Sequence, residues 1–99
     1  MTRTPQLTPQ TMKVLIALYD EPGSSGADLC RATALPSGTV YPILTRLDDA
    51  GWLRSQWEVG DPSRLGRPRK RFYTLTAEGA REAKAGAQLN ASIYARFAS

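Results

Sequence analysis

The stretch SGTVYPILTRLDDAGW, residues 37–52, carries the strongest structural pattern in the chain. Four of its apolar residues follow the i, i+3, i+4, i+7 spacing of one helix face: Val40, Ile43, Leu44 and Leu47. A helix with such a stripe must bury it against other elements of the fold. We therefore expect a helix that Ser37 caps and Gly51 ends, with its opposite side exposed.

Two features qualify this helix. Pro42 lies inside it and removes one backbone hydrogen bond, so we expect a tight or 3₁₀-like first turn. Asp48 and Asp49 lie near its C-terminal end, where they would repel phosphates. If this helix meets nucleic acid, it therefore does so with its N-terminal half.

Two shorter helical patterns come before it. Thr8 and Pro9 form a start signal, with Thr8 as N-cap and Pro9 at the first helical position. The apolar spacing that follows ends at Asp20. A second helix is expected over residues 26–33, with Ser25 as its N-cap and Asp28 three residues further on.

Two β-rich runs and a long helix follow. Residues 52–59 and 71–75 predict a hairpin whose tip, about eleven residues long, exceeds the usual 2–5. Thr76 then caps a helix from Ala77 to about Phe97, with small residues in a seam that begins at Gly79 and Ala83. Such a helix is ~30 Å long. Its apolar far end therefore needs a partner, and a second copy of the chain is simpler than loose packing on the first helix.

The charge is concentrated in the hairpin tip. Residues 60–71 contain five basic residues and one acid, and the remaining residues are neutral in sum, so this segment carries the whole net charge of +4. A footprint for a polyanion concentrates its charge in this way. The basic residues are Arg64, Arg67, Arg69, Lys70 and Arg71. The alternative is a solvated loop that is basic only for solubility.

Several classes of protein are excluded. The chain has no histidine and a single cysteine, Cys30, which removes the usual catalytic triads, His-ligated zinc and internal disulfides. We expect neither an enzyme nor a cofactor or metal. No stretch approaches the ~20 apolar residues that cross a bilayer, and no secretory signal is visible, so we expect a cytoplasmic protein without a membrane partner.

The order helix, helix, helix, β-hairpin, long helix is that of a winged helix-turn-helix, a mostly α-helical fold with a small β-hairpin. Three segments resemble the PadR family of bacterial transcriptional regulators: GTVYPILTRLDDAGWL, SQWE and GRPRKRFYTLTAEG. MarR-type winged helices share the leucine stripe and the LT-x-x-G ending but lack the GTVYP segment. The resemblance implies the short family type, with a DNA-binding domain over residues 1–76 and a dimerisation helix over residues 77–99.

In a winged helix-turn-helix, the second helix of the helix-turn-helix pair lies in the major groove. In this chain that is the helix from Ser37. The residues at its start and on its outward side are Ser37, Gly38, Thr39, Tyr41, Pro42, Thr45 and Arg46. Capping is the alternative role for Ser37, and core packing is the alternative for Tyr41. The five basic tip residues are expected on phosphates or in the minor groove.

The expected function is a sequence-specific, double-stranded-DNA-binding regulator, a repressor that binds a pseudo-palindromic operator as a homodimer. The expected dimer interface or ligand pocket contains Tyr19, Leu89, Ile93, Tyr94 and Phe97. Family resemblance implies that some relatives respond to a small aromatic or lipophilic effector, and Trp52 and Trp57 could also line such a pocket or simply belong to the core. A winged-helix protein-interaction module without specific DNA binding is the alternative.

Overall fold

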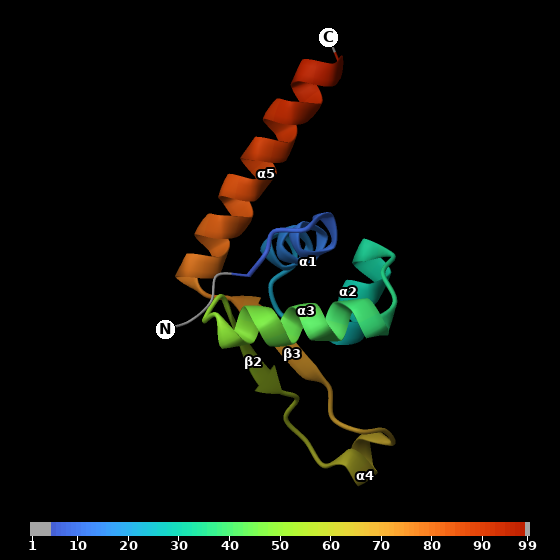
Figure 1. Ribbon diagram of the computed structural model, residues 1–99. Coiled ribbons are helices and arrows are strands. Elements are labelled where there is room, and N and C mark those ends of the chain that lie inside the picture. The colour runs from blue at the N-terminus through green and yellow to red at the C-terminus, as the bar shows by residue number, and fades with distance from the viewer. Residues whose placement is uncertain (1–4, 99) are drawn as a thin grey trace.

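The computed structural model describes the backbone of residues 5–98 and the side chains of residues 5–89. The elements, in chain order, are α1 (Pro9–Asp20), β1 (Ser24–Ser25), α2 (Gly26–Thr33), α3 (Ser37–Asp49), β2 (Leu53–Trp57), α4 (Pro62–Leu65), β3 (Arg71–Leu75) and α5 (Ala77–Ala98). Helices α1, α2 and α3 form the body (Figure 1). The β2–β3 hairpin extends from the body in one direction and α5 extends in the other, which gives a molecule of 55 × 33 × 22 Å.

The starts of the first two helices are those that the sequence predicts. The Thr8 side chain accepts a hydrogen bond from the backbone N–H of Thr11 at 3.2 Å, and Pro9 is the first residue of α1. Ser25 caps α2, and Asp28 completes a capping box. Each cap satisfies N–H groups that have no partner inside the helix.

The predicted cap of α3 is wrong. Pro36, not Ser37, occupies the N-cap position, with φ −70° and ψ 158°, and no side chain caps the helix. The Pro36 carbonyl accepts the N–H groups of Thr39 and Val40 at 2.9 and 3.0 Å. Proline suits this position because its fixed φ matches the extended conformation of a cap residue. Ser37 is therefore the first helical residue, and its exposed hydroxyl is not committed to capping.

The first turn of α3 contains one hydrogen bond of the expected 3₁₀ type, from the Thr39 N–H to the Pro36 carbonyl three residues earlier. The helix is continuous from Ser37 to Asp49, so Pro42 does not break it. Pro42 lacks only the N–H that would bond to the carbonyl of Gly38, four residues earlier. Gly38 is exposed at the start of the helix, so water can satisfy this carbonyl. A proline near the start of an exposed helix face therefore leaves the helix intact.

The core lies beneath α3, and the predicted stripe forms its centre. Val40, Ile43, Leu44 and Leu47 are all at most 3% exposed. Side chains from the other elements complete this core: Met12, Val14, Leu15, Leu18, Leu29, Trp52, Leu53, Tyr73 and Ala83. The spacing of apolar residues thus fixes which side of α3 faces outward.

The sheet has three antiparallel strands in the order β1-β3-β2. Strand β3 has its predicted bounds, whereas β2 is shorter than the predicted residues 52–59. Leu53 and Trp57 lie on one face of β2, as predicted, but only Leu53 is buried. Trp57 is 57% exposed because the hairpin extends past the core. Strand β1 was not predicted, since two residues form a strand only through their pairing with β3.

Helix α5 begins in close contact with the body. The Thr76 side chain accepts the N–H of Gly79 at 3.2 Å, which supports its predicted role as a cap. Gly79 lies directly against the backbone carbonyl of Trp52, and Gly86 lies against the Met12 side chain. The first half of the small-residue seam therefore packs on the body. No helix in the described part of the chain is long and apolar enough to cross a membrane.

We predict that Gly79→Ala lowers the free energy of unfolding by about 1–3 kcal/mol, because an added methyl group would overlap the Trp52 backbone, which cannot move aside. Denaturant unfolding of the purified chain measures this effect. Gly38→Ala is the matched control, since a methyl group there meets open space and raises stability by up to about 1 kcal/mol. Equal unfolding midpoints for the two variants would contradict the close docking of α5.

Candidate nucleic-acid interface

The outer side of α3 presents the residues that the sequence singles out. Six of them are exposed and Thr39 is half-buried; the exposed ones are Ser37, Gly38, Tyr41, Pro42, Thr45 and Arg46. The Thr45 hydroxyl donates a hydrogen bond to the Tyr41 carbonyl at 3.1 Å. Because the hydroxyl proton is committed to the helix, the methyl group and the remaining oxygen lone pairs are what this side chain can offer a partner.

Tyr41 combines the two roles that the sequence left open. Its ring lies against Gly26 at the start of α2, where a side chain on Gly26 would overlap the ring. The same residue is still 46% exposed. Tyr41 therefore packs α3 against α2 and also contributes to the outer surface, and its packing partner is α2 rather than the stripe of its own helix.

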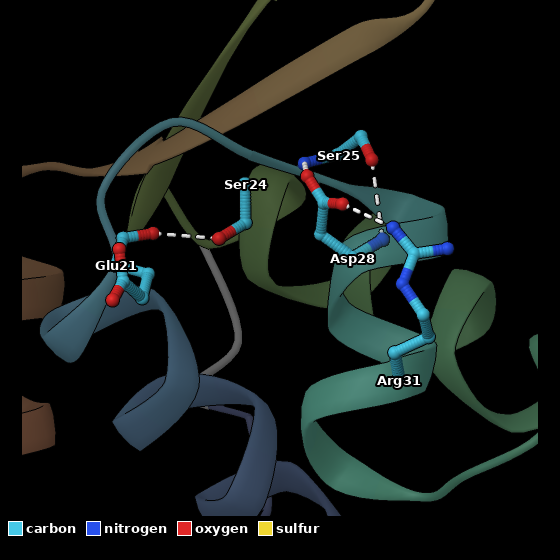
Figure 2. A network of polar contacts seen from close by, with 5 residues as sticks. All are labelled: Glu21, Ser24, Ser25, Asp28 and Arg31. Atoms are coloured by element: carbon cyan, nitrogen blue, oxygen red, sulfur yellow. Dashed lines mark hydrogen bonds and ion pairs between the residues drawn. The ribbon is translucent and has the colours of Figure 1, made fainter.

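A network of polar contacts fixes the start of α2 (Figure 2). The Ser25 N–H donates to the Asp28 carboxylate at 3.0 Å, and the Asp28 N–H donates to the Ser25 hydroxyl at 3.1 Å. The Ser25 backbone N–H at this carboxylate first, then the Ser25 side chain and the Arg31 guanidinium, hold the pKa of Asp28 below its usual value. The Ser24 hydroxyl donates to the Glu21 carbonyl at 2.7 Å, which ties the preceding turn to α1.

The β2–β3 hairpin with its tip, residues 53–75, forms the wing, and the short helix α4 lies at its tip (Figure 1). The Asp61 carboxylate accepts the Ser63 N–H at 3.0 Å, Pro62 is the first helical residue, and Gly66 ends the helix with φ +70°. This helix was not predicted. The signal was present, because Asp61-Pro62 repeats the cap-and-proline pair with which α1 begins. The acid inside the basic tip thus serves as a helix cap.

Arg67 is held by the protein itself. Its Nη1 and Nη2 donate to the two carboxylate oxygens of Glu58 at 2.6 and 3.0 Å. The backbone N–H of Lys70 donates to the same carboxylate at 3.2 Å. We call these three hydrogen bonds the wing clasp. Sequence reasoning missed it, because Glu58 and Arg67 meet only once the hairpin has folded.

The clasp lowers the pKa of Glu58 from 4.5 to about 2, through the Arg67 guanidinium first and the Lys70 N–H second. The same pair raises the pKa of Arg67. Both groups are therefore charged at neutral pH, and the charges of Glu58 and Arg67 offset each other locally.

Arg71 also contacts neighbouring residues of the wing. Its Nη2 donates to the Ser55 hydroxyl at 2.6 Å, and its guanidinium lies 5.4 Å from the centre of the Trp57 ring. At that distance the cation and the ring attract each other. Among the described residues, Arg67 is the one of the five predicted basic residues with an ion pair. Arg71 has only the hydrogen bond and the ring contact just given, and the side chains of Arg64, Arg69 and Lys70 make neither kind of contact there.

One pocket joins the wing to the body. It measures about 380 Å³ and contains no Asp or Glu in its lining. Three cations of the wing (Arg69, Lys70 and Arg71) line it together with Tyr41 of α3. The other lining residues are Ser25, Gly26, Ala27, Trp57 and Tyr73. The structure thus brings part of the predicted helix face and part of the predicted wing to one basic concave surface.

The predicted dimer or ligand residues are described only in part. Tyr19 and Leu89 are 46% and 61% exposed. The side chains of Ile93, Tyr94 and Phe97 lie outside the described residues. Trp52 belongs to the core, whereas Trp57 lines the pocket of the wing.

We predict that the Glu58 carboxyl titrates near pH 2 in the folded chain, which carboxyl ¹³C shifts measure by NMR. Its folded pKa lies below its unfolded pKa, so its stabilising effect on the wing is present above about pH 4.5 and is lost between pH 4.5 and 2. Arg67→Ala should return this pKa toward 4.5. A Glu58 carboxyl that titrates near 4.5 in the unaltered chain would show that the clasp is not formed.

Comparison with known proteins supports a regulator. The chain is 29% identical over 93 residues to the transcriptional regulator HosA of Escherichia coli, a match that covers 94% of this chain and 64% of HosA. The chain thus spans slightly less than two thirds of the length of the curated relatives that it matches.

Solved structures share the fold. One is BpsR of Bordetella bronchiseptica, a protein whose DNA binding is regulated by 6-hydroxynicotinic acid. It aligns with a TM-score of 0.77 at 26% identity, over 96% of this chain and 68% of BpsR. Lactococcus lactis ZitR, a zinc-responsive MarR family member, aligns with a TM-score of 0.75 at 18% identity, over 96% of this chain and 61% of ZitR. These matches confirm the predicted winged-helix fold.

The model of the Transcriptional regulator PadR-like family matches residues 27–85, which include α2 except its first residue, all of α3 and the wing, and the start of α5. The match covers more than half of the chain and contains every segment that carried the predicted resemblance. The family consists of transcriptional regulators, which agrees with the expectation that the chain is not an enzyme. The chain belongs to the PadR-like family of transcriptional regulators.

Proposed function

We propose that this chain is a sequence-specific regulator that binds double-stranded DNA, with α3 in the major groove and the wing along the adjacent backbone. The observation that carries the proposal is the basic pocket between Tyr41 and the wing, which has no acidic residue in its lining. DNA presents a dense row of phosphates, and a concave surface with three cations suits it.

The N-terminal half of α3 is the part that enters the groove in this proposal. A major groove is about 12 Å wide and admits one helix. Ser37 and Gly38 are exposed there, and Gly38 has no side chain to hold the DNA backbone away. Asp48 and Asp49 are exposed at the other end, where they would repel phosphates. The helix therefore approaches the duplex with its first half closest.

Base recognition falls to the middle of the helix. Arg46 is exposed on the same side as Thr45 and has no ion pair within the described residues. An arginine at such a position reads guanine through its O6 and N7 atoms. The methyl group of Thr45, whose hydroxyl proton is committed to Tyr41, suits the methyl group of thymine.

A homodimer completes the proposal. Helix α5 runs to Ala98 and extends beyond the body, and Leu89 on it is 61% exposed (Figure 1). We propose that residues 77–99 pair with a second copy, with Tyr19, Leu89, Ile93, Tyr94 and Phe97 at the interface. A chain that sediments as a monomer at micromolar concentration would contradict this part of the proposal.

In this proposal the twofold dimer binds a pseudo-palindromic operator, and the chain acts as a repressor by occupying a promoter. The regulation of BpsR by an aromatic acid supports a small aromatic effector here too, at the interface between the copies. An operator affinity that no aromatic acid changes would contradict the effector.

The Arg69→Ala, Lys70→Ala double variant tests the role of the wing. Each lost phosphate contact lowers the slope of log K against log salt by about 0.9, so a dimer that loses four contacts shows a slope smaller by about 3 to 4. Binding should weaken for all duplexes alike, as filter binding or fluorescence anisotropy measures at several salt concentrations.

The control is Arg81→Ala, Lys84→Ala, which removes the same charge from two exposed residues of α5. It should keep the slope of the unaltered chain. Equal slopes for the two double variants would remove the wing from the interface. Absence of duplex binding at low salt by the unaltered chain would favour a protein-interaction module instead.

Arg46→Ala should change which sequence is preferred. Loss of one bidentate base contact costs about 1–3 kcal/mol of discrimination at that base pair. Competition between duplexes that differ at single positions measures the change. If the ranking of duplexes is the same for the variant and the unaltered chain, Arg46 does not read a base.

A further inference from the structure

Glu58 is an acidic residue beside the basic segment of the wing. It follows the last residue of β2, directly after Trp57, and its carboxylate lies beside the segment that carries Arg69 and Lys70. If the wing contacts phosphates, a carboxylate at this place repels them. Electrostatic attraction to DNA therefore does not explain why an acidic residue stands at position 58.

The contacts of Glu58 supply a reason. Its carboxylate accepts the two Arg67 hydrogen bonds and the Lys70 N–H, and its own N–H donates to the Lys70 carbonyl at 2.7 Å. The β2–β3 register ends at the pair Trp57 and Arg71. Glu58 thus extends the strand pairing by one residue and joins both ends of residues 67–70 to β2.

Little else holds this segment. Every residue from 66 to 70 is exposed, and none belongs to the hydrophobic core. A segment without buried side chains relies on polar contacts for its conformation. Within the described residues, the other side-chain hydrogen bond of this segment joins Arg67 to its neighbour, the carbonyl of Pro68. The clasp is therefore the main constraint on the segment that presents Arg69 and Lys70 to the pocket.

We infer that Glu58 is a positioning residue for DNA binding: through the wing clasp it holds residues 67–70 so that Arg69 and Lys70 meet the phosphates in a fixed geometry. The inference rests on the proposed function and deepens it. It assigns Arg67 a structural role as the partner of Glu58. Binding strengthens when long side chains and their loop are ordered before the partner arrives.

Charge and position make opposite predictions for Glu58→Gln. The variant keeps the size of the side chain but removes its negative charge. If Glu58 acts only as a charge, the variant binds DNA more tightly. If Glu58 positions the wing, the variant binds about tenfold more weakly, because two long side chains per subunit must be ordered at the interface.

Asp61→Asn is the matched control. It also removes one acid from the wing by an acid-to-amide change, but asparagine caps a helix as well as aspartate does, so α4 remains. Asp61 makes no contact with the clasp among the described hydrogen bonds. We expect equal or tighter DNA binding for this variant, and weaker binding for Glu58→Gln under the same conditions.

The experiment measures the affinity of the full chain for one duplex at fixed salt. Four proteins are compared besides the control: the unaltered chain, Glu58→Gln, Arg67→Ala, and the double variant that combines Glu58→Gln with Arg67→Ala. Positioning predicts that the double variant binds no more weakly than the weaker single variant, because both changes open the same clasp. If the two residues act as independent charges, Glu58→Gln strengthens binding and Arg67→Ala weakens it, and the double variant shows the sum of the two effects.

Amide hydrogen exchange of the unbound proteins provides a readout without DNA. Exchange should accelerate at the Lys70 amide and its neighbours in Glu58→Gln, and stay unchanged in Asp61→Asn and in the core. Tight binding by the unaltered chain together with unweakened binding by Glu58→Gln would overturn the inference alone. Absence of duplex binding by the unaltered chain would overturn the proposed function, and the inference with it.

Discussion

The burial of one face of α3 is the constraint on which the rest of the structure depends. With its apolar stripe in the core, this helix has a single outward side, and the candidate base-reading residues lie on it. Trp52 transmits that geometry: its N–H donates to the Leu47 carbonyl of α3, and its own carbonyl accepts the Thr76 N–H and lies against Gly79. Trp52 therefore fixes the wing and the start of α5 relative to α3.

The electrostatics of the wing depend on geometry more than on the number of charges. Five basic residues account for the net charge of the chain, yet Arg67 pairs with Glu58 and Arg71 lies over Trp57. Their positive charge still contributes to the surrounding field, but these two side chains are held by their neighbours. The cations most available to a partner are Arg64, Arg69 and Lys70. The sequence alone identifies the basic segment. The folded hairpin shows which of its basic residues are held by neighbouring side chains and which are available for contact with a partner.

Local chemistry made most of the fold predictable. Caps at Thr8 and Ser25, the stripe of α3 and the β-rich run at residues 71–75 each depend on neighbours in sequence, and each prediction was confirmed. The cap of α3 was misassigned because the rule that favours serine overlooks a proline one residue earlier. Strand β1, the packing of Tyr41 on Gly26 and the wing clasp join residues distant in sequence, so they could not be predicted from local patterns.

Selection of binding sites from random duplex DNA by the purified chain tests the central claim most directly. A dimer whose two α3 helices enter successive major grooves predicts enrichment of a twofold-symmetric site, with half-sites about one helical turn, ~34 Å, apart. Arg46 and Thr45 would then read the central base pairs of each half-site. Recovery of sequences no different from the starting pool, at a salt concentration where the chain still binds DNA, would contradict sequence-specific recognition by α3.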